Sequence, residues 1–265
     1  MEIAPRITPF YIFNTNVYLL KQYEDTAVIV NRTAYESDWN DIDEKGFPKN
    51  KILKSNINIQ RNLSLIILNA SILEGAVRQV FSATVSRDHH KLGDFASKQS
   101  DPTLKNLLFR SYKKIFNLHI ELEANGSWDN LKKQIKDYAD IKLDDYMIDK
   151  SYFDTLFHLR NAVAHGTALV LPKDEIINKE GDEYLVKWQS RLQSASVLAK
   201  KEFGCELFEA LNHPFFSKVF MDKTQEFIKN ISDLSLFKND QSFVFDNIKA
   251  LTFGFYSPGD YRHSK

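Results

Sequence analysis

The chain has very little cysteine, and this scarcity limits its chemistry. Cys205 is the only cysteine among 265 residues, which excludes an internal disulfide and any zinc site built on thiolates. Such cysteine usage is typical of a reducing compartment, so we predict a cytoplasmic protein. No patterned acid or base accompanies Cys205, and this favours a buried or incidental thiol over a nucleophile.

The sequence also lacks an excess of charge of either sign. Its 35 lysine and arginine residues balance 35 aspartate and glutamate residues. Without a net field to attract nucleic acid or anionic lipid, any phosphate chemistry must depend on local groups. The balance therefore counts against a non-specific DNA-binding protein.

Long apolar runs are absent as well. No stretch approaches the roughly 18 consecutive apolar residues expected of a transmembrane helix. The first twenty residues have no basic leader and no small-residue cleavage site, and Pro5 and Pro9 interrupt them. We therefore expect neither a signal peptide nor a membrane span. Apolar residues still make up 43% of the chain, which is enough for a substantial core.

Helical periodicity is what the sequence has in abundance. Apolar residues recur every three or four positions between residues 52 and 85, which predicts a long central helix. The polar segment 86–94 then predicts a loop. Asp101 and Pro102 have the residue types of an N-cap and a first helical position, and Asn125-Gly126 ends the helix that they begin. Further helices are expected at 127–140 with Ser127 or Asp129 as cap, at 148–166, 190–204 and 214–231, and less clearly at 11–31.

One stretch departs from this pattern. Residues 168–187 have the composition of a β-hairpin that turns at residues 180–182. The expected fold class is therefore mainly α, with a small β-hairpin insertion and irregular termini. We divide the chain into an N-terminal extension (1–50), a helical core (51–205), and a C-terminal helix with a Phe-rich tail (206–265) that belongs to the same domain.

The segment RNAVAH, residues 160–165, places an arginine, an asparagine and a histidine near the end of a predicted helix. A helical wheel puts Arg160 inside the apolar arc, with Asn161 and His165 on its margin. Because a desolvated guanidinium needs an anionic partner, two interpretations compete. Arg160 either pairs with Glu74, on the apolar stripe of the central helix, or binds phosphate oxygens in bidentate fashion through its planar guanidinium. Spacing alone favours the ion pair.

His165 is open to two interpretations as well. A histidine in the last turn of a helix is a favourable partner for the terminal carbonyls, and Asn161 can hydrogen-bond it. Its ordinary pKa near neutrality also makes it the best candidate in the segment for moving a proton. In an ideal helix Arg160 and His165 point about 140° apart. Both reach one phosphate only if the helix unwinds near Gly166 or a second subunit contributes.

Two other segments have residue types found in functional sites. Asp88, His89 and His90 are adjacent, and because adjacent residues rarely share a metal ion we expect no metal site. The basic and aromatic stretch FRSYKKIF, residues 109–116, fits either an RNA-stacking surface or the apolar stripe of its helix, and the stripe explains it better.

The motif Arg160-Asn161-Ala162-Val163-Ala164-His165, preceded by an apolar helix and followed by glycine, resembles the signature of HEPN domains. The segment LIILNASILEGAVRQVF, residues 65–81, carries Glu74 and is similar to the helix that precedes the motif helix in larger bacterial members. The resemblance covers about residues 52–205. It implies a HEPN-like helical bundle that forms a homodimer through the motif helices and uses no cofactor.

For many HEPN members the resemblance implies a metal-independent endoribonuclease of toxin-antitoxin systems, phage defence or stress responses. His165 would act as general acid or base at the ribose 2′-hydroxyl, Arg160 would hold the phosphate, and Asn161 would orient the histidine or the substrate, with Glu74 in support. Cleavage of RNA would leave a 2′,3′-cyclic phosphate and a 5′-hydroxyl. The alternative is a non-catalytic dimerisation or nucleotide- or RNA-binding module.

One position departs from the pattern of a HEPN subgroup. Ala168 stands where a group of HEPN toxins has a tyrosine that a partner nucleotidyltransferase modifies. This argues against that type of antitoxin and leaves another antitoxin or partner protein open.

Overall fold

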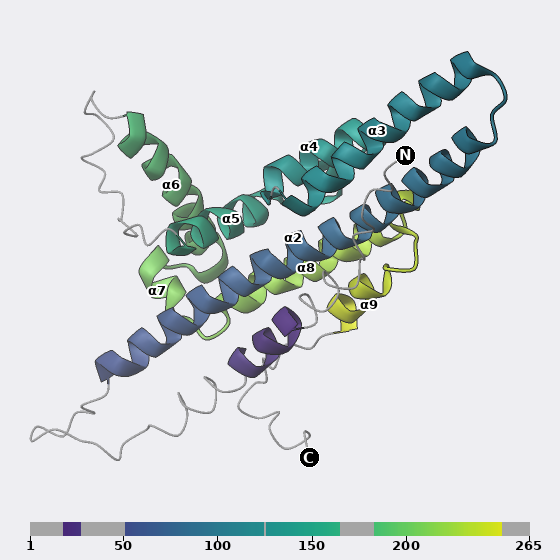
Figure 1. The fold of residues 1–265 in the computed structure, drawn as a ribbon. Coiled ribbons are helices and arrows are strands. Elements are labelled where there is room, and N and C mark those ends of the chain that lie inside the picture. The colour runs from purple at the N-terminus through teal and green to yellow at the C-terminus, as the bar shows by residue number, and fades with distance from the viewer. Residues whose placement is uncertain (1–17, 28–50, 125, 165–182, 251–265) are drawn as a thin grey trace, which may run out of the picture. The chain divides into compact units, whose positions relative to one another are not determined.

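The computed structural model describes residues 18–27, 51–124, 126–164 and 183–250, and the structural statements below concern these ranges. Within them the chain forms α-helices and two short 3-10 helices, without a strand (Figure 1). The prediction of a mainly α fold is confirmed for this part of the chain. Residues 18–27 form the first described helix. The elements that come after it along the chain are α2 (Lys51–Ser97), α3 (Pro102–Ala124), α4 (Trp128–Ala139), η1 (Leu143–Tyr146), α5 (Lys150–Ala164), α6 (Glu183–Phe203), α7 (Leu207–Leu211), α8 (Phe216–Ser232), η3 (Ser235–Phe237) and α9 (Phe243–Ala250).

The chain forms two compact units that interleave along the sequence. Unit 1 includes Ile72–Ile148 and Glu226–Ala250, and unit 2 includes Leu19–Ser71 and Asp149–Gln225. Helices α2 and α8 are each divided between the two units, at Ser71/Ile72 and at Gln225/Glu226. The predicted division at residues 50 and 205 stays a prediction.

In unit 1, the second half of α2 and α3 form an antiparallel helical hairpin (Figure 1). Arg78 Nη1 donates to the Leu122 carbonyl at 2.7 Å, and further along the hairpin the His89 ring stacks on Tyr112 with ring centroids 3.9 Å apart. Gly93 permits this close approach, because a Cβ there would lie 2.9 Å from Tyr112 Cε2.

The predicted loop at 86–94 is wrong, because α2 continues as a helix to Ser97. His89 lies buried in this segment, against the rings of Tyr112 and Phe116 on α3. Packing of one buried face thus maintains a helix whose composition resembles that of a loop. A polar run by itself does not reveal such a face.

The predicted helix boundaries around α3 and α4 are confirmed. Asp101 Oδ1 accepts from the backbone N–H groups of Thr103 and Leu104 at 2.8 and 3.3 Å, and α3 begins at Pro102. The helix ends at Ala124, just before Asn125-Gly126. Of the two cap candidates for α4, Ser127 is the N-cap, since its hydroxyl accepts from the Asn130 N–H. Local capping chemistry fixed these ends.

The segment after α8 completes unit 1. Thr84 Oγ1 on α2 donates to the Leu236 carbonyl in η3 at 2.7 Å, and Asn239 Nδ2 donates to the Val80 carbonyl at 2.9 Å. Within the Phe-rich tail, residues 243–250 form α9 and bury Val244, Phe245 and Ile248. Hydrogen bonds and apolar burial thus attach this segment to α2.

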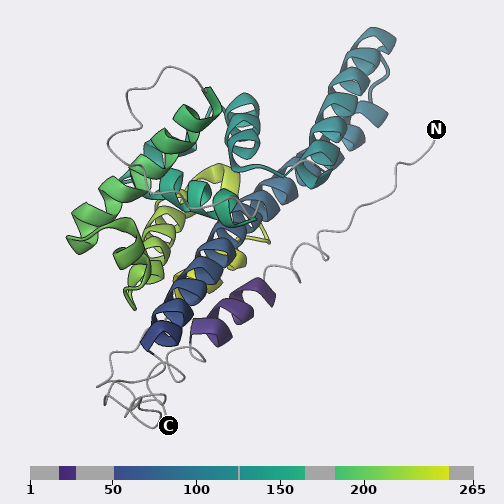
Figure 2. The same ribbon diagram turned by 90° about the vertical axis from the view of Figure 1, so that its left-hand side faces the viewer.

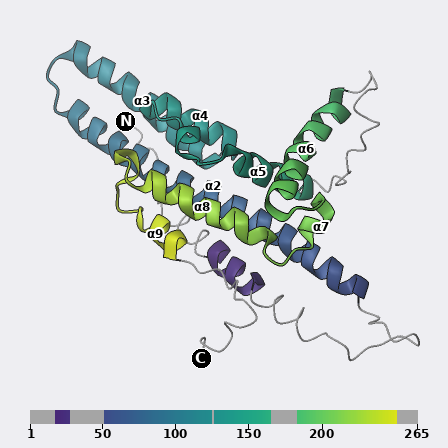
Figure 3. The ribbon, with the colours of Figure 1, turned by 180° about the vertical axis from the view of Figure 1, so that it is seen from behind.

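Unit 2 is organised around the first half of α2. Residues 18–27 form a helix that lies beside it (Figure 2) and buries Leu20, Tyr23 and Ala27 at helical spacing. The first part of α8 runs along the same half of α2 (Figure 3). Asn62 Nδ2 donates to the carbonyls of Leu211 and His213, at 2.7 and 2.9 Å, and Asn62 Oδ1 accepts from Ser217 Oγ. The predicted helix at 11–31 is confirmed for residues 18–27.

The predicted hairpin at 168–187 is wrong where the structure describes it. Residues 183–187, its expected second strand, form the first turn of α6, and the remainder lies outside the described residues. A short apolar run such as Tyr184-Leu185-Val186 is compatible with both periods, and here it continues into the helical pattern that follows. At its other end α6 stops before Gly204, which has a φ of 67° and donates its N–H to the Lys200 carbonyl.

One helix in the described ranges is long and apolar enough to cross a membrane, namely Asn58–Ser97 within α2. Its most apolar window is 67% buried inside the protein. A core helix passes the same test of length and composition, and burial of this extent explains why α2 is so apolar.

Candidate functional site

Helix α5 holds the RNAVAH segment, and its apolar face anchors it in unit 2. The side chains buried on this face are Tyr152, Phe153, Thr155, Leu156, Phe157, Leu159 and Ala162. Helix α6 packs against α5, and the Tyr152 hydroxyl donates to Glu202 near the end of α6. The Tyr152 ring also meets Phe220 edge-on, with centroids 6.2 Å apart. Helix α5 therefore provides a fixed platform for the residues at its C-terminal end.

The predicted apolar arc of α5 is correct along most of the helix and loses burial at its end. On the helical wheel Val163 and Ala164 also fall in the apolar arc, but Val163 is half-buried and Ala164 is exposed. Arg160 is half-buried. The motif thus lies where the helix emerges from the core, with part of the Arg160 side chain open to solvent.

The structure brings Arg160 and Asn161 together. Arg160 Nη1 donates to Asn161 Oδ1 at 2.9 Å, and the Arg160 guanidinium carbon lies 5.9 Å from the centroid of the Phe157 ring. An amide acceptor and an aromatic ring of the same helix therefore orient the guanidinium. Asn161, expected to orient the histidine or the substrate, contacts the arginine in this structure.

His165 and Gly166 lie outside the described residues, and the last described residue of α5 is Ala164. The role of His165 in proton transfer therefore stays a prediction. What the structure contributes is the position of the five preceding motif residues on the exposed end of α5.

Glu74 lies in unit 1, where it is 7% exposed. It accepts from Arg78 Nη2 at 2.7 Å, and Arg78 holds the Leu122 carbonyl with its other terminal nitrogen. The i,i+4 spacing of Glu74 and Arg78 is a signal in the sequence that could have revealed this pair. From the sequence, only Arg160 was predicted as a partner for Glu74. Arg160 lies in unit 2, so its pairing with Glu74 stays a prediction.

The adjacent Asp88, His89 and His90 have separate contacts. Asp88 accepts from the Tyr138 hydroxyl at 2.8 Å, His89 stacks on Tyr112, and His90 is exposed. Within the described ranges, no group of three or more histidine, cysteine, aspartate or glutamate side chains is arranged to hold a metal ion.

The aromatic stretch on α3 packs against α2 at two of its rings. Tyr112 and Phe116 both contact His89, and all three aromatic residues at 109–116 are half-buried. The apolar-stripe interpretation is therefore confirmed for Tyr112 and Phe116. Leu104 and Leu107 share the helical spacing of the same stripe, and their predicted burial is wrong, since they are 38% and 60% exposed.

The surroundings of Cys205 agree with an incidental thiol. Burial raises the pKa of the Cys205 thiol, and Glu209 and Glu206 raise it further by like-charge repulsion of the thiolate. A raised pKa lowers the thiolate fraction at neutral pH, and the thiolate is the nucleophilic form.

A buried polar cluster in unit 2 was missed by sequence reasoning. Arg61 on α2 is 3% exposed, and burial lowers its pKa while the nearby Tyr23 opposes that change. Tyr23 is fully buried beside Ser217, and burial raises the pKa of its hydroxyl. Arg61 falls on a helix whose sequence pattern is otherwise apolar, and no motif marked it.

Comparison with protein families places these helices in a known group. The family described as RiboL-PSP-HEPN matches residues 33–187, which is more than half of the chain. The matched range includes both Glu74 and the RNAVAH segment. The chain belongs to this HEPN family, as the resemblance of the motif predicted, and the match begins and ends earlier than the predicted extent of 52–205. Searches of curated proteins and of solved structures found no match.

Proposed function

We propose that this chain is a metal-independent endoribonuclease of the HEPN type that acts as a homodimer. The observation that carries the proposal is the half-buried Arg160, oriented by Asn161 at the exposed end of α5 in a member of a HEPN family. An oriented, partly exposed guanidinium is suited to bidentate binding of a phosphodiester.

The proposed reaction is transfer of the phosphoryl group within the RNA chain. His165 removes the proton of the ribose 2′-hydroxyl, the 2′-oxygen attacks phosphorus, and the bond from phosphorus to the 5′-oxygen breaks. Arg160 stabilises the negative charge that develops on the phosphate oxygens. The leaving 5′-oxygen takes a proton, so the products carry a 2′,3′-cyclic phosphate and a 5′-hydroxyl.

A homodimer meets the geometric requirement of this reaction, which needs one histidine as base and one arginine at the same phosphate. Since Arg160 and His165 point about 140° apart on an ideal helix, facing α5 helices would bring the arginine of one copy toward the histidine of the other.

Cleavage of single-stranded or transfer RNA in EDTA tests the proposal. Wild-type protein should produce cyclic-phosphate ends, His165→Ala should lower the rate by about 100-fold or more, and DNA of the same sequence should remain intact because it lacks the 2′-hydroxyl. His90→Ala, at an exposed histidine of α2, is the matched control and should retain activity.

Two outcomes would reject the ribonuclease. Equal cleavage by wild type and His165→Ala would point to a contaminating nuclease. Failure of both to cleave, across several salt conditions and substrates, would favour the alternative function, a non-catalytic HEPN-like module for dimerisation or for nucleotide or RNA binding.

For the biological setting, we propose a cytoplasmic role in bacterial defence, in a toxin-antitoxin pair or in a stress response. An RNA-cleaving protein must be restrained in its host, and Ala168 lacks the hydroxyl that one type of antitoxin modifies. Expression in a bacterial host should therefore arrest growth, whereas His165→Ala should not. Equal growth of the two strains at equal expression would contradict this setting.

A further inference from the structure

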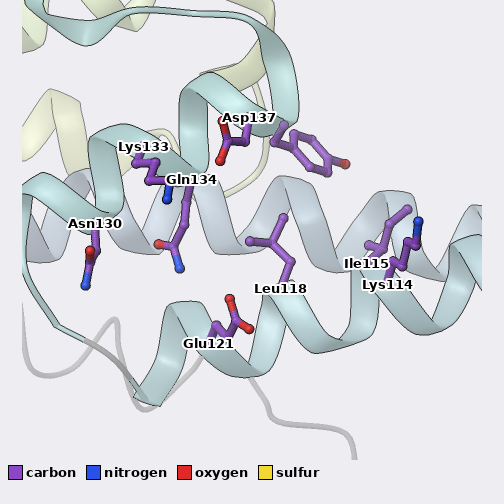
Figure 4. Close-up of a pocket in the computed structure, with 9 residues that line it drawn as sticks. Lys114, Ile115, Leu118, Glu121, Asn130, Lys133, Gln134 and Asp137 are labelled. Carbon is purple, nitrogen blue, oxygen red and sulfur yellow. The ribbon is translucent and has the colours of Figure 1, made fainter.

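A groove between α3 and α4 in unit 1 lies outside the site on α5. Its volume is about 550 Å³, within the usual range for sites that hold a small molecule. Side chains of both helices extend into the space between them (Figure 4). The groove extends along about two and a half turns of α4, from Asn130 to Tyr138.

The charges that line this groove are not paired with one another. Lys114 and Glu121 belong to α3, and Lys133 and Asp137 belong to α4. None of the four side chains has an ion pair within the described ranges, whereas the neighbouring Lys132 is bound to Asp129 and Asp144 at 3.3 and 3.1 Å. Cations and anions are thus both available to a ligand in one groove.

An amide in the middle of the groove lacks a hydrogen-bond partner. Gln134 Oε1 is buried and has no donor among the described residues. Figure 4 shows this side chain reaching from α4 toward α3, with Asn130 one turn away on the same side of the helix. A buried acceptor without a donor costs free energy, so a ligand that donates a hydrogen bond here would remove that cost.

Tyr138 supplies a rigid aromatic wall. Its hydroxyl donates to Asp88 Oδ2 at 2.8 Å, and its ring meets Phe81 edge-on with centroids 5.5 Å apart. Both contacts are on α2, so the ring is fixed from behind while it lines the groove. A fixed aromatic ring is a suitable surface for a nucleobase.

We propose that the groove between α3 and α4 binds a ribonucleotide unit. Lys114 and Lys133, which lie toward opposite ends of the groove (Figure 4), bind the phosphates on either side of the unit, and Gln134 binds the base edge beside Tyr138. Asn130 and the carboxylates of Glu121 and Asp137 bind ribose hydroxyls or exocyclic amino groups. A purely anionic ligand would be repelled by the two carboxylates, and an apolar ligand would leave Gln134 unsatisfied. A nucleotide carries both kinds of group. The proposal does not depend on catalysis at α5.

The test measures binding with two probes, because the unit can come from a free nucleotide or from an RNA chain. Adenosine, guanosine, cytidine and uridine monophosphates are titrated into the wild-type protein by equilibrium dialysis. A labelled single-stranded oligoribonucleotide is titrated into full-length His165→Ala by fluorescence anisotropy, so that cleavage does not interfere. Binding of any mononucleotide identifies a free ligand, and binding of the oligonucleotide alone identifies the chain; either result supports the groove if the variants below agree.

Paired lysine variants separate this groove from general charge attraction. Lys114→Ala with Lys133→Ala should weaken binding about tenfold or more, because two phosphate contacts are lost. The matched control is Lys113→Ala with Lys136→Ala, which removes the same charge from exposed positions of the same helices that do not line the groove, and it should change affinity less than about twofold. Equal weakening by both pairs, or no binding of any probe by the folded protein, overturns the proposal.

Gln134→Leu adds a readout that a purely structural role would not give. It removes a buried unsatisfied acceptor, so the melting temperature should stay constant or rise while affinity falls. A lower melting temperature with unchanged affinity overturns the assignment of Gln134. Loss of RNA cleavage in His165→Ala with intact groove binding would separate the two sites, and the groove assignment would stand even if wild type cleaves nothing.

Discussion

At the residue scale, the guanidinium of Arg160 is the group on which the proposed chemistry depends, and its neighbours on α5 determine its direction. Asn161 Oδ1 accepts a hydrogen bond from Arg160 Nη1, and the guanidinium carbon of Arg160 lies over the Phe157 ring. Because these two contacts are within one helix, they can hold the arginine in this orientation before RNA binds. Such pre-organisation avoids the loss of side-chain freedom at the moment of binding.

Arg160→Lys is expected to lower cleavage more than stability. An ammonium cannot reproduce the planar, bidentate grip of a guanidinium on phosphate, so the rate should fall about 100-fold. The side chain is half-buried at a helix end, so the melting temperature should change little. Cleavage assays and thermal unfolding measure the two effects, and matched losses in both would show that Arg160 has a structural role.

Asn62→Leu is expected to destabilise the fold. Asn62 is fully buried and holds the carbonyls of Leu211 and His213 together with the Ser217 hydroxyl. Leucine would leave these buried groups without their partner, at a cost of about 2–4 kcal/mol. Urea unfolding measures the change. Ser64→Ala is the control, because among the described residues that exposed hydroxyl bonds only the Gln60 carbonyl of its own helix. A similar loss there would contradict the explanation.

His89 should make stability depend on pH in the mildly acidic range. Burial lowers its pKa below the ordinary value of 6.5, and the neighbouring His90 and His119 lower it further. The folded protein therefore binds a proton less readily than the unfolded chain. The stabilisation from neutral His89 is complete above the unfolded pKa and is lost as the pH falls from about 6.5 toward the lowered folded pKa.

Unfolding free energies measured between neutral pH and pH 5 test this dependence. The wild-type value should fall with pH, and His89→Leu should have a smaller slope because it removes the group that titrates. A variant slope equal to that of wild type would exclude His89 as the cause.

At the element scale, capping residues determined helix ends that the sequence could reveal. Asp101 is the example with the simplest test, since its carboxylate accepts from two N–H groups in the first turn of α3. Asp101→Ala should lower the free energy of unfolding by about 1 kcal/mol, which thermal or urea unfolding can measure. Ser100→Ala, one residue earlier and also exposed, should have almost no effect. Equal effects of the two would argue against a cap.

Other elements could not be read from local pattern, for reasons of packing. The segment 86–94 is polar in composition, yet α2 continues through it because His89 and Gly93 fit against α3. Residues 183–187 look like a strand and join a helix instead. In both cases a short segment is compatible with more than one secondary structure. Contacts with neighbouring residues, in space or along the chain, determine which one forms.

At the scale of the whole molecule, we propose that the site combines residues of two chains. Arg160→Ala and His165→Ala should each abolish cleavage when present in both subunits. Co-expressed with different affinity tags and purified as a mixed dimer, the two variants should regain part of the activity, because the mixed dimer keeps one Arg160 and one His165. Mixed dimers as inactive as either parent would contradict a site shared between subunits.

Oligomeric state is a separate measurement at the same scale. Light scattering coupled to size-exclusion chromatography should give the mass of two chains, about twice the 30.8 kDa of one. A mass of one chain over a wide range of concentrations would exclude the homodimer and, with it, the shared site.

The sequence by itself determined the helical class, the capped ends of α3 and α4 and the HEPN motif, because periodicity, caps and motif spacing are local properties of the chain. Only the tertiary structure decided that Arg78 holds the Leu122 carbonyl on α3, that His89 stacks on Tyr112, and that Gln134 Oε1 lies buried in a groove between α3 and α4. These contacts depend on which helix faces meet and on how far each side chain reaches. Such distances follow from packing in three dimensions, which the order of residues along one helix does not specify.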